Sequence, residues 1–279
     1  MDKTAQIDHF LITRFNLKNN HWTEQNVLDP VWLHKRIKIF EQFCYPSVLN
    51  QTQQNFKWLL FFDADTPLEI KNYVSQKYTR QNIHVYYING FKELENSCIS
   101  IIKSLLKTSF FITSRLDNDD ALHKNYIKTV QSLAILKNKT IIDVTKGCQL
   151  YLRGSKGIVN LFVSKYNPFI SLVSSIDNME LIIEKEHNDW NCKTYKYIFY
   201  NKQPLWLQYI HDSNYLNIFN TALKKISIDI NDFNVKNISI DTITIQDKIL
   251  NSINLPKRMY LTLLSQLRLK IKQMKRSLH

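Results

Sequence analysis

Residues 109–120, SFFITSRLDNDD, combine an apolar run with an abruptly acidic end. The aromatic and β-branched side chains of residues 109–116 predict a buried strand. The chain then leaves the core and presents three carboxylates. Because residues two apart in extended backbone point to the same side, we expect Asp117 and Asp119 to converge on one small volume. Carboxylates that lie so close repel each other unless they are protonated or bridged by a cation.

Four further apolar runs predict buried strands, at residues 9–13, 57–62, 83–88 and 140–144. Stretches with helical periodicity separate them, and this alternation is typical of a doubly wound, mainly parallel sheet with helices on both faces. Ligands bind such sheets beyond the carboxyl ends of the strands. The candidate site therefore lies at the strand ends 13–16, 63–66 and 115–120, of which two are acidic.

Two helix starts are marked by their capping residues. Asp29 is expected to cap a helix that has Pro30 at its first position, and we expect Pro46 to end that helix. The next helix is expected to begin within residues 66–69, TPLE, because Thr66 and a glutamate three residues later have the spacing of a capping box.

Glycine is scarce, with four residues in the whole chain, too few for a loop that cradles phosphates. A bound diphosphate must then be neutralised in another way. Carboxylate oxygens suit hard cations such as Mg²⁺ or Mn²⁺, whose remaining positions are filled by water and substrate phosphates. The acidic strand end therefore indicates a metal site. The alternative is a polar turn that caps a helix from His123 onward.

The composition, 44% hydrophobic and 12% aromatic, is that of a folded protein long enough for one large α/β domain. No apolar run approaches the length of a membrane span, and the sequence starts without a secretion signal. The four cysteines are scattered and lack the spacing of a zinc site, which indicates reduced thiols. We therefore expect a cytoplasmic protein.

The formal charge of +13 raises the question of a nucleic-acid or membrane partner. Seven basic residues fall within residues 257–279, which contain no acid, so the rest of the chain has only a modest excess. We expect no nucleic-acid partner, because acidic strand ends would repel phosphates without a metal. In the tail, apolar residues recur at spacings of three and four, which predicts a basic amphipathic helix on an anionic membrane. Packing on the catalytic domain and dimerisation are the alternatives.

Residues 115–122, RLDNDDAL, resemble the metal-binding segment of the bacterial rhamnosyltransferase family, which are glycosyltransferases of GT-A type. The resemblance spans residues 9–214 and includes, in the same order, HFLITRFN (9–16), PSVLNQT (46–52), WLLFFD (58–63), NPF (167–169), HNDW (187–190) and WLQYIH (206–211). An Asp-x-Asp pattern alone is weak, whereas several motifs in order are specific.

The resemblance implies roles for the acidic segment. Asp117 would contact the donor ribose or the metal, and Asp119 would ligate the metal. Asp120 would meet the metal shell or the sugar, and Arg115 would pair with phosphate or with a neighbouring carboxylate. His211 is the expected third metal ligand, with a purely structural histidine as the alternative. The implied cofactor is Mn²⁺ or Mg²⁺.

The ends of the first two strands are expected to contact the nucleotide. Thr13, Arg14 and Asp63 would lie against base and ribose, although Arg14 could instead pair with surface carboxylates. An inverting enzyme also needs a general base for the acceptor hydroxyl. His187 and Asp189 are the main candidates for that base, and spacing does not separate them from Asp177 and Glu180.

We therefore expect a GT-A-type (Rossmann-like) α/β enzyme that moves a sugar, rhamnose by resemblance, from a nucleotide-sugar to a saccharide or lipid-linked acceptor in surface polysaccharide synthesis. Residues 1–215 would form the glycosyltransferase domain, 216–256 a linker or acceptor-side extension, and 257–279 the basic helix at the inner face of the cell membrane. One alternative is a phosphatase of the haloacid dehalogenase type that uses Asp63 and Asp65, although Pro67 departs from its motif. The other is a non-enzymatic basic module.

Overall fold

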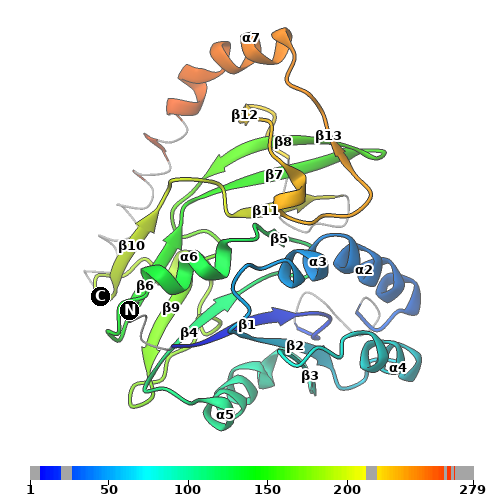
Figure 1. Ribbon diagram of the computed structural model, residues 1–279, viewed down its shortest axis with the longest axis vertical. Coiled ribbons are helices and arrows are strands. Elements are labelled where there is room, and N and C mark those ends of the chain that lie inside the picture. The colour runs from blue at the N-terminus through cyan, green and yellow to red at the C-terminus, as the bar shows by residue number, and fades with distance from the viewer. Residues whose placement is uncertain (1–6, 20–26, 212–218, 261–262, 265–266, 268–279) are drawn as a thin grey trace.

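The computed structural model describes residues 7–19, 27–211, 219–260, 263–264 and 267. Two sheets dominate it (Figure 1). The first sheet contains, in spatial order, β10 (Lys196–Tyr200), β6 (Thr140–Val144), β9 (Ser171–Ser175), β4 (Phe110–Arg115), β1 (Asp8–Arg14), β2 (Lys57–Asp63) and β3 (Ile83–Ile88). Only β9 runs antiparallel to its neighbours. The five strands predicted from the sequence are all present in this sheet, and the mainly parallel α/β fold class is confirmed.

The second sheet is built from segments that follow the first-sheet strands. Its order is β12 (Lys224–Lys225), β8 (Lys156–Val163), β7 (Lys146–Arg153), β11 (Trp206–Ile210) and β5 (Ala121–Leu122), with β13 (Ser239–Ile240) also paired to β8. β5 comes directly after the acidic residues, and β11 leads to His211. The second sheet therefore forms the other wall of the candidate site.

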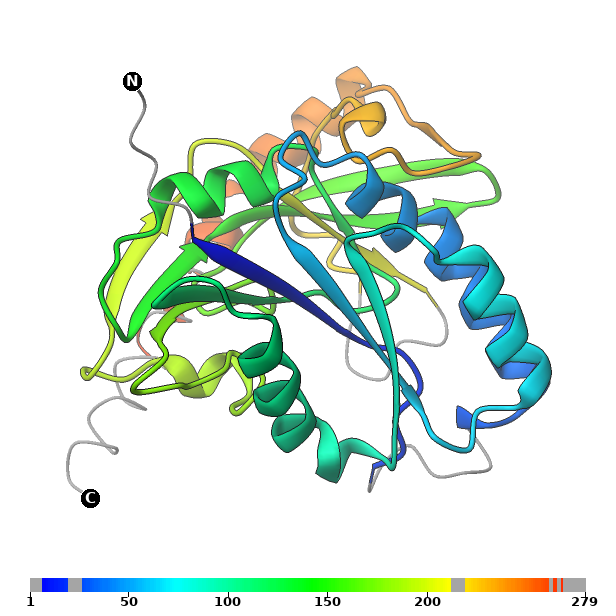
Figure 2. The same cartoon turned by 60° about the horizontal axis from the view of Figure 1, so that its bottom comes forward.

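Helices cover both faces of the first sheet (Figure 2). One face packs against α2 (Pro30–Gln42), α3 (Cys44–Leu49), α4 (Leu68–Lys77) and α6 (Tyr126–Leu133), and the other against α5 (Leu94–Leu105). The strands show why: Leu11 and Leu60 point into the first layer, whereas Phe10 and Leu59 point into the second. This alternation has the period of two that extended backbone imposes.

The described chain also contains three short 3₁₀ helices and one further α-helix. They are η1 (Phe91–Glu93), η2 (His187–Trp190), η3 (Ile230–Asp232) and α7 (Ile245–Ile253). No helix among the described residues is long and apolar enough to cross a membrane. All four cysteines are free, as expected.

Both helix starts were predicted correctly, since α2 begins at Pro30 and α4 at Leu68, whereas two details were wrong. The carboxylate of Asp29 accepts hydrogen bonds from the first turn of α2, at 3.1 and 3.3 Å. That helix ends at Gln42, however, and Pro46 lies inside α3, where its missing N–H is tolerated near a helix start. The capping box at Thr66 does not form, because its hydroxyl accepts a hydrogen bond from Asn16 Nδ2 at 3.0 Å instead.

The predicted basic helix at residues 257–279 lies largely outside the described residues. Its described members, 257–260, 263–264 and 267, are helical. Residues 219–256 contribute β12, β13 and α7 beside the second sheet. The domain boundaries at 215 and 256 stay predictions.

A close contact between β7 and β11 fixes the second sheet behind the site. Trp206 is fully buried, stacks on Phe169 with ring centroids 4.5 Å apart, and donates from Nε1 to Val144 O at 2.7 Å. The indole lies over Gly147, where an added Cβ would come within 2.0 Å of a ring carbon. Only glycine leaves this space free.

We predict that Gly147→Ala lowers the free energy of unfolding by about 1–3 kcal/mol, because the methyl group forces the indole out of its stack. Urea denaturation measures the loss. In a Trp206→Leu background the same substitution should cost clearly less, since the ring that it collides with is gone. An equal cost in both backgrounds would show that the Trp206 contact is not the cause.

Candidate functional site

The ends of β1 and β4 lie side by side and bring the acidic segment beside Arg14. The two strands are parallel, with Ile12 paired to Arg115. Leu116 N continues the pairing by donating to Ile12 O at 3.0 Å. The guanidinium of Arg14 consequently reaches Asp117, with Nη2 3.4 Å from Oδ1. The predicted convergence of these two strand ends is observed.

Two side chains anchor the acidic segment to both sheets. Asn118 Nδ2 donates to Phe15 O at 2.7 Å and to Arg14 O at 3.3 Å, beyond the end of β1. Asp120 Oδ1 accepts from Tyr209 N in β11 at 3.0 Å. Both side chains are buried. The segment is thus held at fixed points and does not cap α6, whose N-cap is Asn125.

Asp117 lies between two guanidinium groups. Arg115 Nη2 is 3.7 Å from Asp117 Oδ2, on the side away from Arg14. Burial raises the pKa of this carboxyl, but the charges of Arg115 and Arg14 outweigh burial and hold its pKa at about 2. Asp117 is therefore ionised at neutral pH, and its side chain is 37% exposed. It is the acid of this segment that a ligand reaches most readily.

Asp119 is shared by two partners. Its Oδ2 lies 3.1 Å from His211 Nε2 and 3.1 Å from Arg36 Nη2. His211, expected from the sequence, comes back to the site at the end of β11. Arg36 was missed, although it sits three residues after Leu33 and four before Phe40, on the buried face of α2. A cation on an apolar helix face is the signal that identifies it.

Asp120 is the most enclosed acid of the segment. Burial, together with the charges of Asp119 and Asp117, raises the pKa of Asp120 well above its ordinary value of 3.8. Its hydrogen bond to Tyr209 N ties it to the second sheet. Asp120 therefore acts in this structure as a fixed point of the loop.

Several buried polar atoms around the acids have no hydrogen-bond partner in the described part of the chain. They are Arg36 Nε, Arg115 Nε, Asn118 Oδ1 and His187 Nδ1. Leaving such groups unpaired costs about 1–3 kcal/mol each, so unpaired groups that gather in one place call for an explanation. A ligand with oxygen atoms would satisfy the two guanidinium groups.

Thr13 and Asp63 are occupied by the protein itself. The hydroxyl of Thr13 is buried and accepts from Trp58 Nε1 at 3.0 Å. The Asp63 carboxylate, also buried, accepts from Lys18 N at 3.2 Å and from Asp65 N at 3.0 Å. Both shape the strand ends, and their predicted contact with a nucleotide stays a prediction.

The four candidate general bases lie in two different regions of the structure. Glu186 Oε2 is 3.8 Å from Arg115 Nη1, which places η2, with His187 and Asp189, beside the acidic segment. Burial, with a smaller effect of Arg115, lowers the pKa of His187 to about 4, so its ring is neutral at neutral pH.

Asp177 and Glu180 lie toward the other end of β4. Ser175 pairs with Phe110 at the start of that strand, and Ile176 N donates to Ser109 O. Glu180 is further engaged by Lys185 Nζ at 2.7 Å. Neither acid is near Asp117, so His187 and Asp189 remain as candidates.

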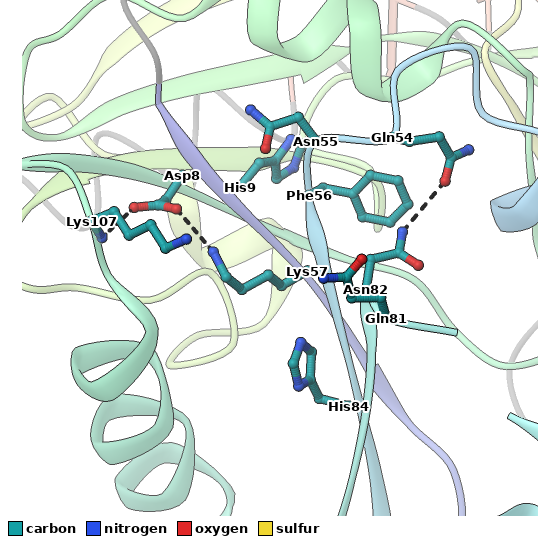
Figure 3. Close-up of a pocket in the computed structure, with 10 residues that line it drawn as sticks. All are labelled: Asp8, His9, Gln54, Asn55, Phe56, Lys57, Gln81, Asn82, His84 and Lys107. Carbon is teal, nitrogen blue, oxygen red and sulfur yellow. Dashed lines mark hydrogen bonds and ion pairs between the residues drawn. The ribbon is translucent and has the colours of Figure 1, made fainter. Parts of the chain in front are cut away.

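A hollow of about 590 Å³ lies at the opposite edge of the first sheet (Figure 3). It is lined by Asp8, His9, Lys57 and His84 at the amino ends of β1, β2 and β3, with Lys107 nearby. Asp8 pairs there with Lys57 at 2.9 Å. Ligands of parallel sheets bind at the other edge, so this hollow is separate from the candidate site.

The atoms around Asp119 indicate how a divalent cation could be held at this site. Among the described residues no three His, Cys, Asp or Glu groups are close enough together to hold a metal by themselves. Asp119 and His211 do converge, with two atoms 3.1 Å apart. Mg²⁺-type sites commonly use one or two protein ligands together with substrate phosphates. The pair therefore fits a cation that arrives with a diphosphate.

A comparison with protein-family models identifies the family of this chain. A sequence profile of the family described as "Putative rhamnosyl transferase" matches residues 11–219. No curated relative matches the chain.

Three similar solved structures are distant. They are TarS 1-349 from S. aureus (10% identity, TM-score 0.44), HddC from Yersinia pseudotuberculosis (11%, 0.36) and the inositol-1-phosphate CTP transferase from T. maritima (10%, 0.37). The matched regions cover 60% of TarS 1-349, 93% of HddC and 89% of the CTP transferase. They cover 73%, 72% and 73% of this chain, respectively. The chain thus spans less than two thirds of TarS 1-349.

We predict that Asn118→Ala lowers the free energy of unfolding by about 1–3 kcal/mol, because two buried carbonyls lose their donor. Asn118→Asp should cost more, since it adds a carboxylate among three others. Urea denaturation at neutral pH compares the two. If Asn118→Asp were as stable as the natural protein, the amide would not be the anchor of this segment.

Proposed function

The chain belongs to the family described as "Putative rhamnosyl transferase", and from this we propose that it transfers a sugar from a nucleotide-sugar to a hydroxyl group. Rhamnose is the sugar that the family description names. The proposed acceptor is a saccharide or a lipid-linked saccharide of surface polysaccharide synthesis, at the inner face of the cell membrane. Residues 1–215 would form the catalytic domain, and residues 216–256 an acceptor-side extension.

One observation carries the proposal. Asp117 and Asp119, at the carboxyl edge of a mainly parallel sheet, are surrounded by Arg14, Arg36 and Arg115. This arrangement supplies both signs of charge that a nucleoside diphosphate and its counter-ion require. Guanidinium groups bind phosphate oxygens in pairs, and the Nε atoms of Arg36 and Arg115 have no hydrogen-bond partner among the residues that the structure describes. Without a glycine-rich loop, these arginines would orient the diphosphate.

Asp119 and His211 are the residues that would hold Mn²⁺ or Mg²⁺, with Asp117 and Asp120 nearby. When bound, such a cation stabilises the negative charge of the departing nucleoside diphosphate. The contribution of the protein is to hold these side chains in place. Arg36 and His211 both orient Asp119 through its Oδ2, and Asn118 fixes the backbone between the two acids.

For the acceptor hydroxyl, we propose that a residue of η2 takes the proton. His187 and Asp189 lie beside Arg115, on the side where Glu186 meets that guanidinium. The His187 ring is neutral at neutral pH, since its pKa is about 4, and one of its nitrogens can accept a proton. A pKa this low makes the ring a weak base, so Asp189 remains a candidate beside it. An inverting reaction would place this base opposite the diphosphate.

The geometry disfavours the phosphatase alternative. A nucleophilic aspartate must present an oxygen to phosphorus, but both oxygens of Asp63 accept hydrogen bonds from backbone N–H groups and the side chain is fully buried. Asp65 is engaged by Lys18 Nζ at 2.6 Å.

We predict that Asp119→Asn reduces sugar transfer at least ~10²-fold, because the charge that holds the cation against the diphosphate is lost. Release of nucleoside diphosphate from a panel of nucleotide-sugars provides the assay. Asp65→Asn is the matched control, since it removes an aspartate from the neighbouring strand end and should leave transfer intact. Normal transfer by a folded Asp119→Asn protein would refute the assignment, and phosphatase activity lost only in Asp65→Asn would favour the alternative.

We also predict that nucleoside diphosphate binding depends on Mn²⁺ or Mg²⁺. Chelation with EDTA should weaken binding at least about tenfold, read as the concentration dependence of thermal stabilisation. His211→Ala should reduce this dependence on metal, whereas His34→Ala, on an exposed histidine of α2, should not. Tight binding in excess EDTA would make the acidic segment a structural feature only.

A further inference from the structure

Helix α7 is attached to the protein by its polar side. Asp247 Oδ2 pairs with Lys225 Nζ at 3.0 Å, and Asn251 exchanges two hydrogen bonds of 3.0 Å with the backbone of Lys225 in β12. Asp247 also forms a capping box with Thr244, which fixes the start of the helix. One turn beyond α7, Arg258 donates to Ala222 O at 3.3 Å. These contacts hold one face of the helix against the second sheet.

The opposite face of α7 is apolar and exposed. Ile245, Ile249 and Ile253 recur at intervals of four, so they lie on one side of the helix. They are 76%, 53% and 66% exposed, and Leu250 beside them is 54% exposed. The exposed apolar residues continue beyond the helix with Leu255, Met259, Tyr260, Leu263 and Leu267. An amphipathic helix normally buries this face against its own domain, whereas here the polar face is docked.

The charge around this face is of one sign. From residue 248 to residue 279 the sequence contains eight lysines and arginines and no acid. Lys248 and Lys257 are exposed next to the apolar residues, as is Lys224 in β12. The last acid, Asp247, is neutralised by Lys225. In Figure 1, α7 lies at the outer end of the molecule, beyond the second sheet.

We propose that the exposed apolar face of α7, together with Lys224, Lys248 and Lys257 beside it, forms a membrane-docking surface for anionic phospholipid. Apolar side chains would enter the boundary between headgroups and acyl chains while the basic residues contact the headgroups. A second copy of the chain would bring like charges together around the same face, which disfavours dimerisation. The surface deepens the membrane location proposed above, and its test needs neither donor nor acceptor.

The experiment is co-sedimentation of the full-length protein with vesicles of phosphatidylethanolamine and phosphatidylglycerol, and with vesicles of phosphatidylcholine alone. We expect binding only to the anionic vesicles, and weaker binding at high salt. Replacing Ile249 and Ile253 by serine should weaken binding by roughly tenfold or more. The matched control replaces two other exposed leucines by serine, Leu68 at the start of α4 and Leu136 in the loop after α6, and should bind as the natural protein does.

Two results would overturn the proposal. One is equal binding of the natural protein to both kinds of vesicle, and the other is equal binding by the Ile249 and Ile253 variant and by the control variant. Light scattering tests the remaining alternative, which is a dimer. If the protein is a dimer that does not bind vesicles, and if Ile249→Ser with Ile253→Ser converts it to a monomer, the face is a contact with a second copy of the chain. Urea denaturation checks that both variants stay folded. Loss of vesicle binding with sugar transfer unchanged would separate this surface from the catalytic site.

Discussion

The candidate site depends on how one short loop is tied to two sheets. The amide of Asn118 is bonded to backbone carbonyls beyond β1, and the carboxylate of Asp120 is bonded to the backbone of β11. Asp117 and Asp119 lie between and beside these fixed points. They pair with the guanidinium groups of arginines from β1, β4 and α2. The repulsion among three neighbouring carboxylates is offset by those cations, so the loop and its surroundings stabilise each other.

Five of the seven strands of the first sheet could be predicted, and the signal is strongest for β1, β2, β4 and β6, which are buried on both sides. Continuous apolar runs such as residues 57–62 are a strong signal, and the carboxyl edge follows from parallel topology. The acidic pair was found for the same reason, since Asp117 and Asp119 follow directly after a strand. His211 was expected only by resemblance to a family, and the structure places it 3.1 Å from Asp119.

The remaining parts depend on contacts between distant segments, which local sequence does not show. The strands of the second sheet are interrupted by polar residues, and their pairing depends on features such as the space that Gly147 leaves for Trp206. Thr66 had the spacing of a helix cap, but Asn16, fifty residues earlier, takes its hydroxyl. Arg36 was missed because a helix residue 83 positions from Asp119 gives no local sign of its partner.

The pairing of Arg36 and His211 with Asp119 bears on the order in which ligands enter. The guanidinium of Arg36 already serves as the counter-charge of this carboxylate, at 3.1 Å. A free cation would have to compete with that internal one, and it would gain little. A diphosphate changes this balance, because it gives the arginines a second anion to pair with. It also gives the cation further oxygen ligands. In the proposed reaction, donor and metal would therefore enter as one complex, and free divalent ions alone would leave the proposed cation site empty.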